Sequence, residues 1–461
     1  MAIILATALV FYLSPWPLVS LPALALLALS ICLRLDIGLI LVAFSIPFYL
    51  YPKHILGMSV SMVEITTLLC IAAWVLKAIF QLLASSLQPP ISNIQYPISN
   101  LQHRLLSLDF AVIFFVALSA FSLLIAENFG VAMRELRVVV FESALFYFLL
   151  RVSPLGKRHL WRIVEALVLA ALIVSLIGLY QYCFTDDVIT AEGVRRIHGV
   201  YGSPNNLGLF LERIVPILAA VVLFGGSVWR RALYFLIALP VTICLYLTYS
   251  RGAWLLGLPA AFIFFGLMRG RKVLLISFLV ILAIALSLLP LIGTERLASL
   301  FNTQSGTTFL RLKLWQGSLN MIRDHPLFGV GLDNFLYQYR TRYVLPGAWE
   351  ELDLSHPHNI VLDYWTRLGI LGVIAIAWLQ FAFFRKALCL YRQLGDCDLK
   401  ALLLGLMASM VAFLAHGLID NSYFMVDLAF VFYLTLGITA RVERLGETVE
   451  TNSGSFIRGE L

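Results

Sequence analysis

The sequence predicts an all-α protein that crosses a membrane many times. Of its 461 residues, 61% are hydrophobic and only 13% are charged, and the mean hydropathy is +0.91. Such values are typical of chains built from apolar runs long enough to span a bilayer. The runs follow one another with mostly short connections, which is the arrangement of polytopic helical membrane proteins.

Each of the stronger apolar runs has about the length of one bilayer crossing. They cover residues 62–84, 108–126, 160–182, 207–224, 253–268, 273–291, 360–384 and 399–418. Weaker runs cover residues 3–13, 18–32, 37–50, 138–150, 232–248 and 424–440. Together they predict about fourteen crossings, or about twelve if the first two runs form a short re-entrant pair. The first run lacks the basic start of a signal peptide, so we expect it to be retained.

Basic residues fall on every second connection between these runs. The clusters are Lys157, Arg158 and Arg162; Arg230 and Arg231; Arg269, Arg271 and Lys272; and Arg385, Lys386, Arg392 and Lys400. The positive-inside rule places these connections in the cytoplasm. Topology therefore accounts for the formal net charge of +7, and nucleic-acid binding is not indicated. The six cysteines form no CxxC pair, which argues against a disulfide framework or a thiolate metal site.

The same rule divides the chain into segments by the side of the membrane. The expected segments are an N-terminal transmembrane bundle at 1–292 with a cytoplasmic linker at 85–107, an extracytoplasmic loop at 293–357, C-terminal transmembrane helices at 358–441 and a cytoplasmic tail at 442–461. The linker contains PISNIQY followed by PISNLQH, a composition typical of flexible segments. The loop has apolar residues at helical spacing between Leu310 and Ile322, which predicts an amphipathic helix.

Several arginines lie on the predicted outer connections close to the membrane. Arg251 lies in the short turn YSRGAW, where a guanidinium is costly unless it meets water or an anion. Arg311 precedes Trp315 by four residues on the predicted loop helix, so both lie on one face. Arg134 and Arg137 are three residues apart at the start of another span. Guanidinium groups suit phosphate oxygens, so the set indicates a phosphate or diphosphate ligand. For Arg251 the alternative is an interfacial arginine, and the glycine that follows it favours function because it lets a ligand approach the backbone closely. For Arg311 alone, a solvated charge on the helix face is the plainer alternative.

The stretch YGSPNNLG predicts the start of a membrane helix on the outer side. Its free backbone N–H groups and the amides of Asn205 and Asn206 can hold a phosphate or a sugar hydroxyl, and plain capping is an equal alternative. Glu212 and Arg213 follow just inside that helix. As neighbours they cannot pair on one helix face, and charges within a span indicate function.

Two histidines, His356 and His358, stand at the entrance to the span at 360–384. A zinc site needs at least three protein ligands, and only His325 and Asp353 are loosely placed to join the pair, so we predict no metal. A histidine near neutral pH is suited to taking a proton from a hydroxyl. The structural alternative is a helix-entry cap, which Asn359 can supply.

These motifs resemble those of the O-antigen ligase and polymerase superfamily of bacterial envelope enzymes. HNIVLDYWTRLGILG, which starts at His358, is similar to the family's histidine motif, and RLKLWQGSLNMIRDHPLFGVGLDNF at 311–335 is similar to its loop. YSRGAW resembles its earlier arginine motif, and HGLIDNSYF resembles its last outer turn. The resemblance covers roughly the C-terminal half in the family's order, and the N-terminal half matches only in hydropathy.

The resemblance implies a GT-C-like glycosyltransferase of the bacterial cytoplasmic membrane, with its active site facing outward. Such an enzyme moves a glycan from undecaprenyl diphosphate to an acceptor hydroxyl without a metal or another cofactor. His358 would be the base, and Arg251 and Arg311 would bind the leaving diphosphate. The residues expected to contact the substrate are Arg134, Arg137, Asn205, Asn206, Arg213, Trp315, His356 and Asn359. The acceptor stays open among lipid A core, a growing polysaccharide and a protein.

A transporter or flippase of lipid-linked oligosaccharide or polysaccharide is the main alternative. It would share the many spans and the arginines. Transporters hold their substrates near the bilayer midplane on broken helices. In this chain the polar residues concentrate at the predicted outer surface beside a structured loop, which favours the enzyme.

Overall fold

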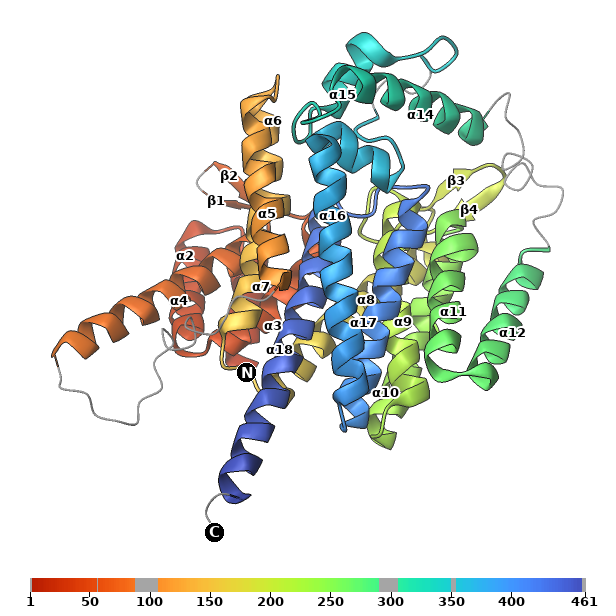
Figure 1. The fold of residues 1–461 in the computed structure, drawn as a ribbon. Helices are drawn as coiled ribbons and strands as arrows, with labels where there is room; N and C mark the ends of the chain where they lie inside the picture. Colours follow the sequence, from red (N-terminus) through yellow and green to blue (C-terminus); the bar gives the residue numbers. More distant parts are fainter. Residues whose placement is uncertain (1, 56, 88–106, 290–305, 350–353, 458–461) are drawn as a thin grey trace. The chain divides into compact units, whose positions relative to one another are not determined.

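The computed structural model describes residues 2–55, 57–87, 107–289, 306–349 and 354–457. Helices make up nearly all the regular structure of these residues (Figure 1). Short strands form two antiparallel hairpins, one from β1 and β2 and one from β3 and β4. The all-α class predicted from the sequence is therefore confirmed.

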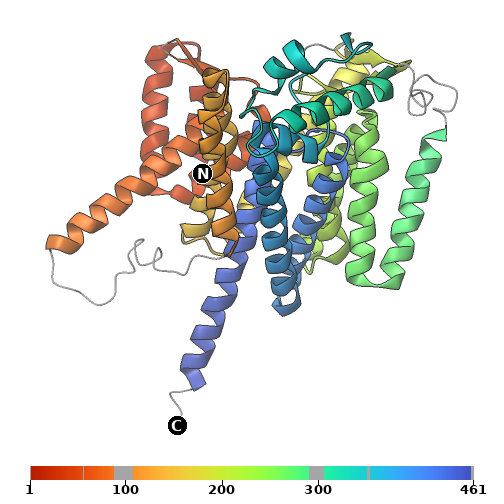
Figure 2. The ribbon, with the colours of Figure 1, turned by 45° about the horizontal axis from the view of Figure 1, so that its top comes forward.

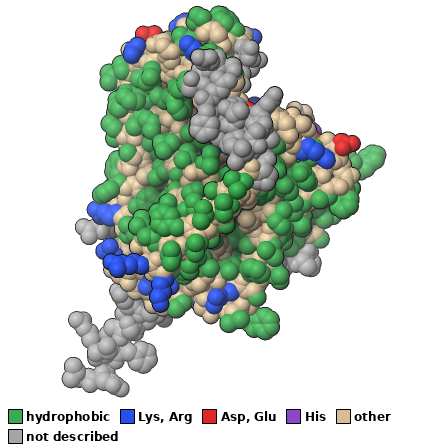
Figure 3. Space-filling view, turned by 90° about the vertical axis from the view of Figure 1, so that its right-hand side faces the viewer, with side chains coloured by type: hydrophobic (Ala, Val, Ile, Leu, Met, Phe, Trp, Pro, Cys, Tyr) green, Lys and Arg blue, Asp and Glu red, His purple; other side chains and the backbone are tan. Residues whose placement is uncertain are grey.

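In the described part of the chain, seven helices are long and apolar enough to cross a membrane. They are Met62–Leu83, Ser107–Leu124, Lys157–Phe184, Pro204–Phe224, Val228–Leu247, Ile360–Gln393 and Cys397–Gly417, and shorter apolar helices run at Ile4–Leu13, Pro17–Leu33, Leu35–Phe48 and Ala253–Arg269. Figure 3 shows hydrophobic side chains over most of one face, with Lys and Arg side chains near both its lower and its upper end. These features confirm a polytopic helical membrane protein, and the number of crossings stays a prediction.

The chain forms two compact units. Unit 1 comprises Met1–Leu106, Phe141–Ala170 and Phe430–Leu461, and unit 2 comprises Ser107–Val140 and Ala171–Ala429. Two long helices, α8 (Lys157–Phe184) and α18 (Val426–Ile457), contribute residues to both units. The segments expected from the sequence were defined by the side of the membrane on which they lie, so these two units do not test their limits. Those limits stay a prediction. Most of the expected linker, at 88–106, lies outside the described residues.

Unit 1 is built on the N-terminal helices. Its elements are α1 (Ala2–Leu13), α2 (Pro17–Leu33), α3 (Leu35–Ser45), η1 (Ile46–Phe48), β1 (Lys53–Ile55), β2 (Met58–Val60), α4 (Met62–Leu87), α7 (Glu142–Val152) and parts of α8 and α18. Helix α4 packs against α2, α3 and α7. The buried rings of Phe146 and Phe430 lie 5.8 Å apart and join α7 to α18. Exposed apolar side chains on α2 and α4 include Leu26, Leu68 and Phe80, as expected for helices in contact with lipid.

Unit 2 carries most of the predicted outer connections. Its elements are α5 (Ser107–Phe121), η3 (Ser122–Leu124), α6 (Phe129–Glu135), the π-helix η4 (Leu136–Phe141), β3 (Ile189–Ala191), β4 (Val194–Arg196), α9 (Pro204–Phe224), α10 (Val228–Leu247), the π-helix η5 (Ala253–Gly257), α11 (Leu258–Arg269), α12 (Arg271–Ser287), α14 (Gly306–Asp324), α15 (Phe335–Gln338), the π-helix η7 (Tyr339–Tyr343), α16 (Ile360–Gln393) and α17 (Cys397–Gly417). Helix α9 packs against α10 and α17, and α16 packs against α5 (Figures 1 and 2).

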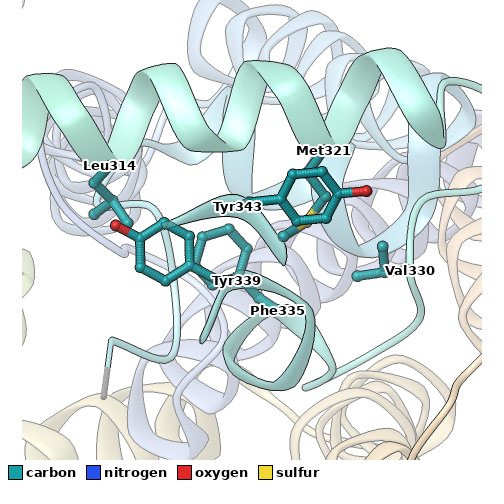
Figure 4. Close-up of a cluster of buried hydrophobic side chains, with 6 residues drawn as sticks. All are labelled: Leu314, Met321, Val330, Phe335, Tyr339 and Tyr343. Atoms are coloured by element: carbon teal, nitrogen blue, oxygen red, sulfur yellow. The ribbon is translucent and has the colours of Figure 1, made fainter. Parts of the chain in front are cut away.

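Residues 306–349, which lie between α12 and α16 in the chain, fold into a layer with a small core of its own. Figure 4 shows this core, which consists of Leu314, Met321, Val330, Phe335, Tyr339 and Tyr343. Phe335 and Tyr339 stack with ring centroids 5.4 Å apart. The amphipathic helix predicted in this loop is confirmed as α14, and its apolar residues cover the core.

Helix α16 is kinked at Gly369, where φ is 69°. The kink lets the preceding loop dock on the helix: the Val330 N–H donates to Thr366 O at 2.7 Å, and the Ile370 N–H donates to Pro326 O at 3.0 Å. A side-chain carbon at Gly369 would overlap with the loop backbone and would also be strained at this positive φ. The glycine in the histidine motif therefore fixes the loop layer to the helix that begins beside His358.

Candidate functional site

His358 lies in the turn that leads into α16 and has a φ of 47°, which is rare for a residue other than glycine. Asn359 caps α16 with its side-chain oxygen, which was the structural alternative, and its Nδ2 donates to Leu418 O at 2.9 Å. From the loop side, Trp315 Nε1 donates to Pro357 O at 2.9 Å. Such strain costs about 1 to 3 kcal/mol, and these contacts on both flanks offset it. The imidazole is therefore held in one place.

The partner of this imidazole is Asp420, in the turn after α17. His358 Nδ1 and Asp420 Oδ1 are 2.6 Å apart, within a short charge-assisted hydrogen bond. His356 Nε2 is 3.9 Å from the same oxygen, and the two imidazole centroids are 4.3 Å apart. With Nδ1 bonded to the carboxylate, Nε2 is the nitrogen of His358 that can accept a proton.

Charge at this pair is set by burial and by the neighbouring imidazoles. Burial raises the pKa of the Asp420 carboxyl, but the charge of His358, its hydrogen bond and the neighbouring His356 hold that pKa well below its usual range. Burial, and then the charge of His358, lower the pKa of His356. At neutral pH the site therefore contains a carboxylate and a neutral His356.

Arg251 lies between α10 and η5 and bridges two other elements of unit 2. Its Nη2 donates to Glu192 Oε2 at 2.6 Å, and its Nη1 donates to Thr307 Oγ1 at 3.2 Å. Glu192 lies in the turn of the β3–β4 hairpin, and Thr307 is an exposed residue in the first turn of α14. The guanidinium is thus positioned between a hairpin and the loop helix before any ligand binds.

One face of α14 links Arg251 to the histidine turn. Thr307, Arg311 and Trp315 follow one another at intervals of four residues, so they lie on one side of the helix. The first contacts Arg251, and the last contacts Pro357, next to His358. Arg311 therefore lies between the two anchors. Within the described part of the chain it forms no ion pair.

A buried imidazole and carboxylate extend the site into the interior. His416 Nδ1 is 2.7 Å from Glu212 Oε2, and its Nε2 is 4.0 Å from Asp420 Oδ2. The close approach of His416 to the backbone requires Gly252, because a side-chain carbon there would overlap with the imidazole. The glycine after Arg251 was expected to let a ligand approach the backbone, and in the structure its neighbour is His416.

A second buried cluster, centred on Arg367, holds the chain just before His356 in place. Arg367 Nε donates to Asp363 Oδ1 at 2.7 Å, across the four-residue spacing that places both on one face of α16. Its Nη1 also donates to both oxygens of Glu135, at 2.7 and 2.6 Å, and its Nη2 donates to Ser355 O at 3.2 Å. Glu135 was not predicted, because nothing in its local sequence indicates a partner on α16. The cluster anchors the start of the histidine motif.

The other arginine candidates lie in different surroundings. Arg134 ends α6 and Arg137 lies in η4, and both are exposed. Arg213 is fully buried, and its Nη2 donates to Ser422 O at 2.8 Å beside the Phe413 ring. It thereby holds the turn that carries Asp420.

The two asparagines stand in the first turn of α9, which begins at Pro204 with Ser203 as its cap, as predicted. Asn205 Oδ1 accepts from Arg196 Nη2 at 2.6 Å. Asn206 is half-buried beside it. Arg196 also donates to Thr248 O at 2.9 Å, so the β3–β4 hairpin is tied to both α9 and the turn before Arg251.

Sequence analysis missed three groups of this site, Asp420, Glu192 and His416. Asp420 and His416 lie in HGLIDNSYF, which was already placed on the outer face, so ionisable residues in that motif were an available signal. Glu192 lies in a hairpin that hydropathy does not reveal. Its pairing with Arg251 depends on how the hairpin packs.

The two histidines and Asp420 are also close enough together to hold a metal ion. Ligand atoms of His356, His358 and Asp420 all lie within 4.8 Å of one another. The third residue that could act as a ligand is therefore Asp420, and the sequence had suggested His325 or Asp353 instead. Asp353 lies outside the described residues. Imidazole and carboxylate are both donors that zinc accepts.

Fold and site together define a multi-pass membrane protein in which a histidine–carboxylate pair and two arginines meet a structured loop. Residues 233–377 match a protein family described as O-antigen ligase, a segment that contains Arg251, Arg311 and His358. Over an alignment of 284 residues the chain is 25% identical to an O-antigen ligase of Salmonella typhimurium. This alignment covers 58% of this chain and 67% of that protein. Both matches are to O-antigen ligases, the superfamily that the motifs of the sequence resemble. They support a glycan-transferring enzyme over a transporter.

Proposed function

We propose that this protein transfers a glycan from an undecaprenyl diphosphate carrier to an acceptor hydroxyl at the outer face of the bacterial cytoplasmic membrane. The face of α14 carries the proposal. Thr307 contacts Arg251 at one end of this face, and Trp315 contacts the residue before His358 at the other. Two guanidinium groups and an imidazole are thus positioned by one helix, as a single reaction centre requires.

His358 is the general base of this reaction. Because Nδ1 is bonded to Asp420, Nε2 takes the proton of the acceptor hydroxyl. The acceptor oxygen forms its bond to the anomeric carbon of the donor sugar as this proton moves. The bond between that carbon and the diphosphate oxygen breaks, and undecaprenyl diphosphate leaves with the electron pair.

Arg251 and Arg311 bind the departing diphosphate. Negative charge increases on this group as its bond to the sugar breaks, so preplaced guanidinium groups stabilise the transition state more than the bound donor. Arg251 already pairs with Glu192, and the diphosphate has to compete with this carboxylate. The pairing preorganises Arg251 at the cost of some donor affinity.

Asp420 positions the base and stabilises its charged form. A carboxylate at Nδ1 selects the tautomer with a free Nε2 and lies next to the imidazolium that proton transfer creates. His416 and Glu212 pack behind it and limit its movement. The acceptor hydroxyl belongs to a glycan, a lipid or a protein.

Metal independence is part of the proposal. It is supported by the hydrogen bond between His358 and Asp420, because a metal on Nδ1 would have to replace the proton there. The two arginines supply the positive charge that a metal would give to the diphosphate. Activity should therefore survive exhaustive chelation of the purified protein. Restoration of a lost activity by zinc or magnesium would instead assign His356, His358 and Asp420 as ligands.

The decisive experiment is turnover of a synthetic undecaprenyl-diphosphate-linked glycan by the purified full-length protein in liposomes. Release of undecaprenyl diphosphate and formation of the new glycoside are both measured. His358→Ala should lower turnover by about 100-fold or more, because general base catalysis contributes that much. His325→Ala, on the same loop, serves as the control and should keep full turnover.

The arginine roles are tested in the same assay. Arg311→Lys keeps the charge but loses the planar fork, so turnover should fall by about tenfold or more. Arg323→Lys is the matched control, because Arg323 lies on the same helix, is exposed and hydrogen-bonds Asn320, one turn before it. Equal turnover in both lysine variants would reduce Arg311 to a generic surface charge.

A further inference from the structure

Unit 1 contains a cavity that the proposed glycan transfer does not use. Its volume is about 500 Å³, and it lies where the end of α2, the second half of α4 and the α7–α8 connection meet. The connection carries the basic cluster at 157–162, so the cavity opens on the predicted cytoplasmic side.

The cavity has an excess of positive charge. Arg34 donates two hydrogen bonds to Asp36, at 2.9 and 2.8 Å, and His159 Nε2 lies 3.8 Å from that carboxylate. Lys77, on the opposite wall, forms no ion pair within the part of the chain that the structure describes. Arg34 and Lys77 against the single carboxylate of Asp36 leave one positive charge unmatched. An anion with a single negative charge fits this balance.

Two polar atoms in the wall lack partners. Ser153 is 2% exposed, and its Oγ has no hydrogen-bond partner among the described residues; the same is true of Gln81 Oε1. A buried hydroxyl or amide is costly to leave unpaired. The serine can donate a hydrogen bond, and the amide oxygen can only accept one. A complementary ligand therefore has both an acceptor for Lys77 and Ser153 and a donor for Gln81.

Apolar side chains continue from the cavity to the surface of unit 1. Leu35, Trp74 and Val152 line the apolar part of the wall. On α4, Leu76 and Phe80 stand next to the polar lining residues and are exposed. Exposed apolar groups on a membrane helix contact lipid chains, and a polar cavity beside them is placed at the depth of headgroups.

We propose that this cavity binds the headgroup of an anionic phospholipid. Lys77 and Ser153 donate to the phosphodiester oxygens, and Gln81 Oε1 accepts from a headgroup hydroxyl. Phosphatidylglycerol has this combination of one negative charge, a phosphodiester and hydroxyl donors. Phosphatidylethanolamine has the phosphodiester but no net charge. Glycerol phosphate has a phosphate and hydroxyl groups, as the headgroup of phosphatidylglycerol does, but it has no acyl chains.

The test uses the full-length protein in neutral detergent micelles, with Tm followed by tryptophan fluorescence. Phosphatidylglycerol should raise Tm in a saturable way, because a ligand of the folded state stabilises it. Phosphatidylethanolamine and glycerol phosphate at equal concentration should leave Tm unchanged. In Lys77→Gln and Ser153→Ala the half-saturating concentration of phosphatidylglycerol should rise by about tenfold, since each loses a hydrogen bond to a charged group.

Two further variants make the result specific. Lys272→Gln removes a lysine from α12 in unit 2 and should keep the wild-type response, whereas Lys77→Arg keeps the charge and should retain most of it. An equal effect of glycerol phosphate would overturn the lipid as the source of the phosphate. An equal effect of phosphatidylethanolamine would overturn the selection for an anion. An unchanged response in Ser153→Ala and Lys77→Gln would remove the cavity as the binding site.

Discussion

His358 Nδ1 and Asp420 Oδ1 lie 2.6 Å apart although the two residues are 62 positions apart in the chain. One stands before α16 and the other after α17, and these helices pack on each other. The hydrogen bond therefore joins the ends of two adjacent membrane helices. It also decides which nitrogen of the imidazole is available to a substrate.

Asp420→Asn should lower kcat by about 100-fold, because an amide can donate to Nδ1 and leave the proton on Nε2. The variant keeps the size of the side chain, so its Tm should stay near that of the wild type. Turnover is measured across the neutral pH range, together with Asp186→Asn, which changes an exposed carboxylate of the same unit. If Asp420→Asn and wild type share one kcat and one pH profile, Asp420 has only a structural role.

Gly252→Ala should lower both stability and turnover. The added methyl group would overlap with the His416 imidazole, which is held by Glu212, and overpacking of this kind costs about 1 to 3 kcal/mol. Because Arg251 is the preceding residue, its position should shift as well. Gly202→Ala is the control, since a methyl group at Gly202 meets no atom within 4 Å. A Gly252→Ala protein as stable and active as Gly202→Ala would contradict the packing described here.

The membrane helices could be predicted from the sequence because apolar length is a local property. The predicted run at 207–224 corresponds to α9 and the run at 399–418 to α17, each within a few residues. The departures from regular helix could not be predicted. The kink at Gly369 depends on the docking of Pro326 and Val330, which lie in the preceding loop.

In the candidate site, too, some features could be predicted from the local sequence and others depend on tertiary packing. His358, Arg251 and Arg311 stand out because a polar residue at the edge of an apolar run is visible in the sequence. Their partners are set by tertiary packing. Spacing alone excluded a pair between Glu212 and Arg213; in the structure Glu212 bonds His416, and Arg213 bonds a backbone carbonyl. No local pattern specifies either partner.

His356 should make folding sensitive to mild acid. Burial, and then the charge of His358, lower its folded-state pKa below the ordinary value of 6.5, while the unfolded chain keeps that value. As pH falls below about 6.5, the unfolded state binds more protons than the folded state, so the free energy of unfolding decreases. The Asp420 pKa is lowered too, so its contribution is present above about pH 4 and is lost only below that.

His356→Gln should therefore flatten the decrease in Tm between neutral pH and about pH 5. His325→Gln serves as the control, because it removes a loop histidine outside this cluster. Asp363 and Asp420 are the acidic neighbours of His356, and both stay unchanged in the variant. An identical pH dependence of Tm in His356→Gln and wild type would show that His356 titrates alike in both states.

The side of the membrane that carries α14 decides whether a lipid-linked donor can reach the site. The basic clusters at 157–162, 230–231, 269–272 and 385–400 predict that their connections face the cytoplasm, which places the loop of α14 outside. In a background in which Cys32, Cys183, Cys389 and Cys397 are replaced by serine, a cysteine at Gln316, exposed on α14, should react with an impermeant maleimide on intact spheroplasts. A cysteine at Gly395 should react only after the membrane is permeabilised. The opposite labelling pattern would put His358 on the side of nucleotide sugars and would exclude an outer lipid-linked donor.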